Sequence, residues 1–255
     1  MRVALLQLGA NQKSRSANLQ SLMAAIDRAA TDDDELDILV MPVIGDTHAK
    51  KAGLRGLFAS VSETIAWKAR EWGVYIATAM NVKENENIRL RSFLFDPDGD
   101  VVVRTGGVSS SESGSDQESV CWFSSAVGRI GVVDPRTAEA VIRSTDGCRE
   151  EGFVAYPIPS PKTAAERRLV ASTLHSLRSD AEVTLGAYWG VAGRTDRDAV
   201  TGNAGNAVTF LRDASGAVSK HASLFRETAL HVEIDLTSVR GDAGHGIRSS
   251  DDHTD

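Results

Sequence analysis

Apolar and polar residues follow one another along this chain in blocks that predict alternating strands and helices. Residues 3–8 and 37–41 are short, mostly apolar runs of strand length, a pattern typical of strands covered on both faces. Between them, apolar residues in segment 19–26 recur at i, i+3, i+4 and i+7, which places one stripe of a helix against a sheet. The chain therefore begins as a β-α-β unit.

The rest of the chain continues this alternation and adds two hairpins. The first hairpin turns at Asp96-Pro97-Asp98-Gly99, where proline sets the bend and glycine supplies the positive φ that such turns often require. The second turns around Ser215-Gly216. Strands are predicted at 73–79, 91–95, 100–104, 129–133, 152–156, 182–188, 206–212, 217–221 and 229–236, and helices at 62–72, 136–145 and 163–178. This order predicts mixed sheets with helices outside, an α/β fold.

Length and composition predict a single domain. A chain of 255 residues with 42% hydrophobic residues can bury one substantial core. We assign residues 1–240 to this domain, because from residue 241 onward the sequence is polar. Residues 241–255 are expected to form a flexible tail.

Charge and cysteine content exclude several classes of function. A net charge of -7 argues against nucleic-acid binding, since the basic residues are too few to neutralise a row of phosphates. No apolar run approaches the roughly 20 residues that cross a bilayer, so membrane insertion is not expected. Two cysteines, with no segment typical of a secretory signal, favour the cytoplasm. No motif indicates a cofactor or a metal.

Several segments together resemble the nitrilase, or carbon-nitrogen hydrolase, superfamily. They are the apolar run that ends at Met41-Pro42, the stretch Gly128-Arg129-Ile130-Gly131, and the segments around residues 1–8, 18–19 and 231–240. The resemblance implies an α-β-β-α sandwich. It also implies assembly through the helices, either as a homodimer or as a hetero-oligomer with an active homologue.

The three catalytic groups of that family are not found at the matching positions. Relatives carry a glutamate base after the proline, where this chain has Val43. Their lysine falls on Gly107, and Arg104 is the nearest cation. Their cysteine nucleophile falls in a short deletion at Asp134, or on Pro135 if no deletion is assumed. The residues at these positions predict that this chain keeps the fold of the family but lacks its glutamate-lysine-cysteine triad.

Other residues could carry relocated chemistry. Asp46 and His48 follow the base position and could act as acid and base, although a solvated loop is the simpler interpretation. Cys121 precedes Trp122-Phe123 in an apolar setting typical of a buried, unreactive thiol. Cys148 is expected on a peripheral turn. Relatives also use a second glutamate that supports the site, and Glu112 and Glu118 remain alternatives for it.

Two functions follow from these observations. The first is a non-catalytic nitrilase-superfamily protein, or pseudoenzyme, that acts either as a binding or oligomeric partner of an active homologue or as a carrier of a small ligand. The second is a divergent hydrolase that acts on carbon-nitrogen bonds of small amides or nitriles through Asp46, His48, Asp134 or Cys121.

Overall fold

A computed structural model gives the structure of the chain. It describes residues 1–9, 15–44, 54–84, 87–105, 120–134, 152–158, 164–179, 187–195, 209–213, 217–222 and 227–236. Within these ranges the chain forms two mixed sheets and three long helices.

The first sheet has the strand order β10-β1-β2-β3-β4-β5, and β13 also pairs with β1. Its strands are β1 (Arg2–Gly9), β2 (Ile38–Val40), β3 (Tyr75–Glu84), β4 (Asn87–Phe95), β5 (Val101–Arg104), β10 (Arg194–Thr195) and β13 (Thr228–Glu233). Strands β1, β2 and β3 are parallel, whereas β4, β5 and β13 run antiparallel to their neighbours. The carboxyl ends of β1, β2 and β3 therefore meet at one edge of the sheet.

The second sheet has the order β12-β11-β9-β8-β7-β6. Its strands are β6 (Cys121–Ser125), β7 (Gly128–Val132), β8 (Gly152–Pro157), β9 (Ala187–Ala192), β11 (Phe210–Arg212) and β12 (Val218–His221). Strands β7, β8 and β9 are parallel in its centre.

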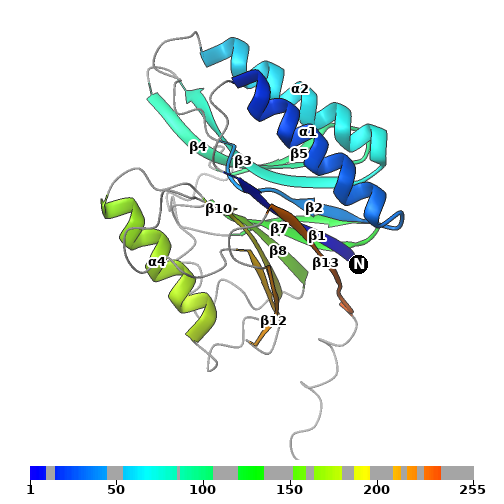
Figure 1. Cartoon of the computed structure of the whole chain (residues 1–255), viewed down its shortest axis with the longest axis vertical. Helices are drawn as coiled ribbons and strands as arrows, with labels where there is room; N and C mark the ends of the chain where they lie inside the picture. Colours follow the sequence, from blue (N-terminus) through cyan, green and yellow to red (C-terminus); the bar gives the residue numbers. More distant parts are fainter. Residues whose placement is uncertain are drawn as a thin grey trace, which may run out of the picture.

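The sheets pack face to face, and helices cover their outer faces (Figure 1). Helices α1 (Arg15–Asp32) and α2 (Leu54–Trp72) lie on the first sheet, and α4 (Ala164–Ser179) lies on the second. The layer between the sheets is apolar and includes Leu5, Val40, Ile130 and Phe153. The α-β-β-α sandwich expected from the sequence is thus confirmed.

At Gly190 the two sheets approach each other too closely for a side chain. A Cβ atom on Gly190, in β9, would lie 2.3 Å from Cζ of Phe153 and 2.8 Å from Cδ2 of Leu5 in the first sheet. Ordinary contacts of a Cβ atom lie at 3.4–4 Å. A side chain at this position would therefore push the sheets or their side chains apart.

Local predictions were accurate where the pattern was strong. Helix α1 buries Leu22 and Ile26 from the predicted stripe, and the first hairpin turns at Gly99 with φ of 80°. The strand expected at 182–188 agrees with β9 in its described part, Ala187 and Tyr188, but β9 continues to Ala192. Strands β6 and β10 were not predicted.

Some expectations fall on parts of the chain outside the described residues. These are the helix at 136–145 and the tail at 241–255, so the single-domain assignment for 1–240 remains a prediction. No helix in the described ranges is long and apolar enough to cross a membrane.

Candidate functional site

The base position, Val43, lies directly after β2, at the edge where the two sheets meet. Its side chain is buried, with 5% exposed. Its amide nitrogen donates a hydrogen bond to the carbonyl oxygen of Ile158, just after β8, at 3.2 Å. The preceding carbonyl, of Pro42, accepts a hydrogen bond from Oγ1 of Thr78 at 3.2 Å. The backbone of residues 42 and 43 is therefore held by hydrogen bonds to both sheets, and the side chain of Val43 has no group that can transfer a proton.

A buried ion pair lies beside this position. Arg91 of β4 and Asp134, which follows β7, are 4% and 8% exposed, and Nη1 of Arg91 lies 3.7 Å from Oδ2 of Asp134. Met80 of β3 pairs with Arg91 on one side and forms an isolated bridge with Ile44 on the other. Arg91 thus lies in the same cross-strand row of the first sheet as Ile44, the residue after Val43. Its guanidinium approaches Asp134, which follows β7 of the second sheet.

Neutral hydrogen bonds hold the same region together. Oγ of Ser92 donates to the carbonyl oxygen of Val133 at 2.8 Å, while the amide of Ser92 donates to Oγ1 of Thr105 at 2.9 Å. All three residues are buried. This chain of bonds connects the end of β5 with the end of β7, next to the predicted lysine and cysteine positions.

The cation of this site was missed by the sequence analysis. Arg104, the nearest cation considered there, is exposed and lies over the ring of Phe93 at 5.9 Å. The buried cation is instead Arg91. Its signal was present in the sequence: Arg91, Phe93 and Phe95 alternate along β4, and both phenylalanines face the apolar layer under α1 and α2. An arginine in register with buried phenylalanines indicates a buried charge that needs a partner.

Cys121 of β6 lies close enough to Asp134 for the two side chains to interact electrostatically. Burial, and to a smaller extent the negative charge of Asp134, raise the pKa of the Cys121 thiol above its usual value. Both causes disfavour the thiolate, which is the nucleophilic form. The raised pKa favours the protonated thiol at neutral pH, and the side chain is half-buried rather than buried as the sequence suggested.

The remaining candidates of the sequence analysis cannot be placed, because they lie outside the described residues. They are Asp46, His48, Gly107, Glu112, Glu118, Pro135 and Cys148. Their roles remain predictions. Of the predicted positions, the structure places Val43, Asp134 and Cys121.

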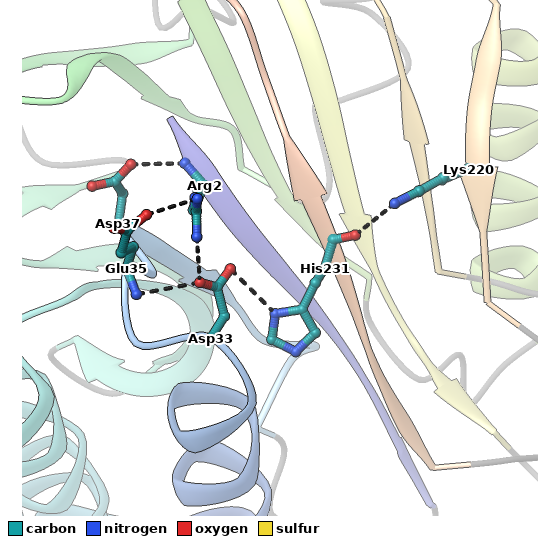
Figure 2. Close-up of polar contacts among 6 residues, drawn as sticks. All are labelled: Arg2, Asp33, Glu35, Asp37, Lys220 and His231. Carbon is teal, nitrogen blue, oxygen red and sulfur yellow. Dashed lines mark hydrogen bonds and ion pairs between the residues drawn. The ribbon is translucent and has the colours of Figure 1, made fainter.

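A second polar cluster lies at the opposite, amino ends of β1 and β2 (Figure 2). Arg2 contacts Asp33 at 3.1 Å and Glu35 at 2.7 Å, and the amide of Arg2 donates to Asp37 at 2.7 Å. Nδ1 of His231, on β13, lies 3.8 Å from Asp33. These contacts join β1, β13 and the loop between α1 and β2, so the cluster stabilises the sheet edge.

Comparisons with known proteins give the fold of the chain. No protein-family model matches the sequence, and no curated protein matches it either. Among solved structures, the NitN amidase from Nesterenkonia sp. AN1 is 15% identical, with a TM-score of 0.65 over 95% of this chain and 98% of that one. A variant of that amidase with acrylamide added at its active-site cysteine has 15% identity, a TM-score of 0.66 and the same coverage.

A further structure of the same enzyme, a cysteine-to-serine variant, is described as an amidase from the nitrilase superfamily. It is 15% identical, with a TM-score of 0.65 over 95% of this chain and 96% of that one. Identity at this level says nothing about the reaction, but the likeness extends over nearly the full length of both chains. The protein thus has the fold of a nitrilase-superfamily amidase.

Proposed function

We propose that this chain is a nitrilase-superfamily protein that binds a small molecule without hydrolysing it. The observation that carries the proposal is the buried pair of Arg91 and Asp134, which lies beside Val43 where the family places its catalytic groups. The described residues of this region thus hold an ion pair, in which Asp134 is engaged with Arg91, whereas the base position itself is aliphatic.

The chemistry of amide hydrolysis supports this interpretation. A nucleophile must attack the carbonyl carbon, a base must move the proton, and a donor must stabilise the oxyanion. Val43 cannot move a proton. The pKa of the thiol of Cys121 is raised, which leaves it protonated at neutral pH. The guanidinium of Arg91 could stabilise an oxyanion, but a donor alone does not cleave an amide.

A divergent hydrolase is the alternative, favoured by one observation. Asp134 lies near enough to Cys121 to influence the titration of the thiol, so a carboxylate and a thiol share one part of the structure. In such an enzyme Asp134 would accept the thiol proton and Cys121 would attack a small amide or nitrile. The position of Cys121 on strand β6, rather than at the turn after β7, makes this the less favoured proposal.

Ammonia release from small amides and nitriles tests the proposal. The purified protein and a Cys121→Ser, Asp134→Asn double variant prepared in the same way should both release no ammonia from acetamide, butyramide or acetonitrile above a protein-free blank. Turnover in the wild type that disappears in the double variant would establish the alternative and overturn the proposal. Turnover that persists in the double variant would overturn both assignments of residues.

Two further expectations accompany this proposal. We place the protein in the cytoplasm, and we expect it to assemble as a homodimer or as a hetero-oligomer with an active homologue. Sedimentation of the purified chain, alone and mixed with such a homologue, tests the assembly.

A further inference from the structure

We propose that proton uptake by His231 forms an ion pair with Asp33 and thereby fixes strand β13 to the loop that follows helix α1. The two residues belong to the polar cluster at the amino ends of β1 and β2 (Figure 2). The inference involves neither Val43 nor Asp134, so it is independent of the proposed function. It gives the fold a contact that responds to pH in the range in which histidine side chains titrate, between about pH 5 and 8.

The ring of His231 is incompletely satisfied in its surroundings. Its Nδ1 and Nε2 atoms are both buried, and neither has a hydrogen-bond partner in the part of the chain that the structure describes. A neutral imidazole carries one N–H donor and one acceptor nitrogen, and buried polar groups of either kind are normally hydrogen-bonded. The neutral ring therefore leaves both of its polar atoms unsatisfied at this position.

Asp33 provides an acceptor for this ring. Its Oδ1 atom already accepts hydrogen bonds from Nη1 of Arg2 at 3.1 Å and from the amide of Glu35 at 3.2 Å. Its Oδ2 atom instead faces His231, at 3.8 Å from Nδ1 (Figure 2). A charge-assisted hydrogen bond is about 2.7–2.9 Å long, so the ring has to move by about 1 Å to form it. The two groups thus face each other without being hydrogen-bonded.

Asp33 is a carboxylate throughout the range in which histidine titrates. Burial raises its pKa, but the hydrogen bonds from Arg2 and Glu35, followed by the charges of Arg2 and of a protonated His231, lower it below its usual value of 3.8. Between about pH 4 and 6, an imidazolium and a carboxylate can therefore face each other here.

The charges around His231 favour an additional proton. Helix α1 packs against β13 and ends at Asp32, next to Asp33, and the C-terminal end of a helix stabilises a cation. Near this end α1 carries Arg28 and Asp32, which are both exposed and opposite in charge. Acidic residues outnumber basic ones in the rest of the surroundings, which include Arg2 on β1, Asp33, Glu35 and Asp37 before β2, Lys220 on β12 and Glu233 on β13. A protonated ring thus reduces an excess of negative charge.

The direction of the pH dependence follows from where the ion pair exists. Asp33 and His231 are far apart in the sequence, so they meet only in the folded chain. The ion pair therefore stabilises the docking of β13 below the pH at which histidine binds its proton, and this effect is lost as pH rises past that value. At the other end of the strand, Glu227 accepts a hydrogen bond from the amide of Gly9 at the carboxyl end of β1. The strand that the ion pair fixes thus extends from the polar cluster to the edge of the sheet where Val43 lies.

Hydrogen exchange of the β13 amides in the full chain tests this inference. Protection is measured at about pH 5.5 and about pH 8, each relative to an unstructured chain at the same pH, which removes the intrinsic pH dependence of exchange. The amides of Leu230 and Val232, which lie opposite β1, should be about 3- to 10-fold better protected at the lower pH. Equal protection at the two pH values, or lower protection at the lower pH, overturns the inference.

Variants assign the effect to the ion pair. His231→Gln keeps a polar side chain that does not titrate, so the increase in protection should disappear. It should persist in the matched control His221→Gln, because this second histidine lies exposed on β12 and its Nδ1 atom contacts the carbonyl oxygen of Ala222, at 3.4 Å. Asp33→Asn should also remove the increase, since an amide offers the imidazolium no opposite charge, and it serves in place of His231→Gln should that variant fail to fold. An increase that persists in His231→Gln or Asp33→Asn, or that is lost in His221→Gln, overturns the assignment.

Discussion

Replacing Gly190 with alanine should destabilise the protein by driving a methyl group between the two sheets. The new Cβ would lie 2.3 and 2.6 Å from two ring atoms of Phe153 and 2.8 Å from Leu5. These atoms belong to different sheets, and β9 is held between β8 and β11, so no single movement relieves the three contacts. Overpacking of this kind costs about 1–3 kcal/mol, and three contacts below 3 Å place this site near the upper end.

Part of that cost is offset in the unfolded chain. Alanine has less backbone freedom than glycine, which stabilises a compatible site by about 0.4–1 kcal/mol. The expected net loss in the free energy of unfolding is therefore about 2 kcal/mol. Urea unfolding followed by circular dichroism measures this loss directly.

A second substitution provides the control. Phe153→Leu removes the ring atoms nearest to the new methyl group, so the double variant should lose less stability than the sum of the two single changes. A Gly190→Ala protein as stable as the wild type would refute the close approach of the sheets at this point. Strict additivity of the two substitutions would refute the role of Phe153.

Three other predictions concern polar groups. Ser92→Ala removes the hydroxyl that donates to the carbonyl of the buried Val133, just after β7, and should cost about 1–3 kcal/mol in urea unfolding, whereas Ser124→Ala, at an exposed position, should cost little. Because its pKa is raised, Cys121 should react slowly with iodoacetamide at pH 7 and faster as pH rises past 9; a fast reaction at pH 7 would contradict the raised pKa of this half-buried thiol. Burial raises the pKa of Asp33, but the hydrogen bond from Arg2, the hydrogen bond from the amide of Glu35 and the charge of Arg2 outweigh burial and hold that pKa below 3.8. Asp33 therefore stabilises the fold above pH 3.8 and loses this effect as pH falls through the lowered pKa. Asp33→Asn should therefore destabilise the protein at pH 7, with a difference from wild type that shrinks towards pH 2.

The fold could be predicted from the sequence because its signals are local and repeated. The helical stripe of α1 and the proline-glycine turn of the first hairpin each follow from a few neighbouring residues. Strand β10 gave no such signal, since it has only two residues, Arg194–Thr195, and pairs with β1, which is distant in sequence. Pairing of this kind is decided by tertiary structure.

The site was only half predictable, for a related reason. Val43 and Asp134 could be named from the sequence because they follow recognisable strands, and the structure places both in buried positions. Arg91 was missed, because its partner Asp134 is far along the chain and belongs to the other sheet. A strand pattern shows which face a residue occupies, but it does not show which charge will meet it there.

The outermost strand of the second sheet has a consequence for how the protein behaves at high concentration. All four residues of β12, Val218–His221, are exposed, and an exposed strand edge can template pairing with another molecule. Nζ of Lys220 donates to the carbonyl oxygen of His231 on β13 at 2.9 Å, which places a positive charge between the two strands (Figure 2). Acetylation of that amine would remove the charge, and self-association through this edge would then become easier.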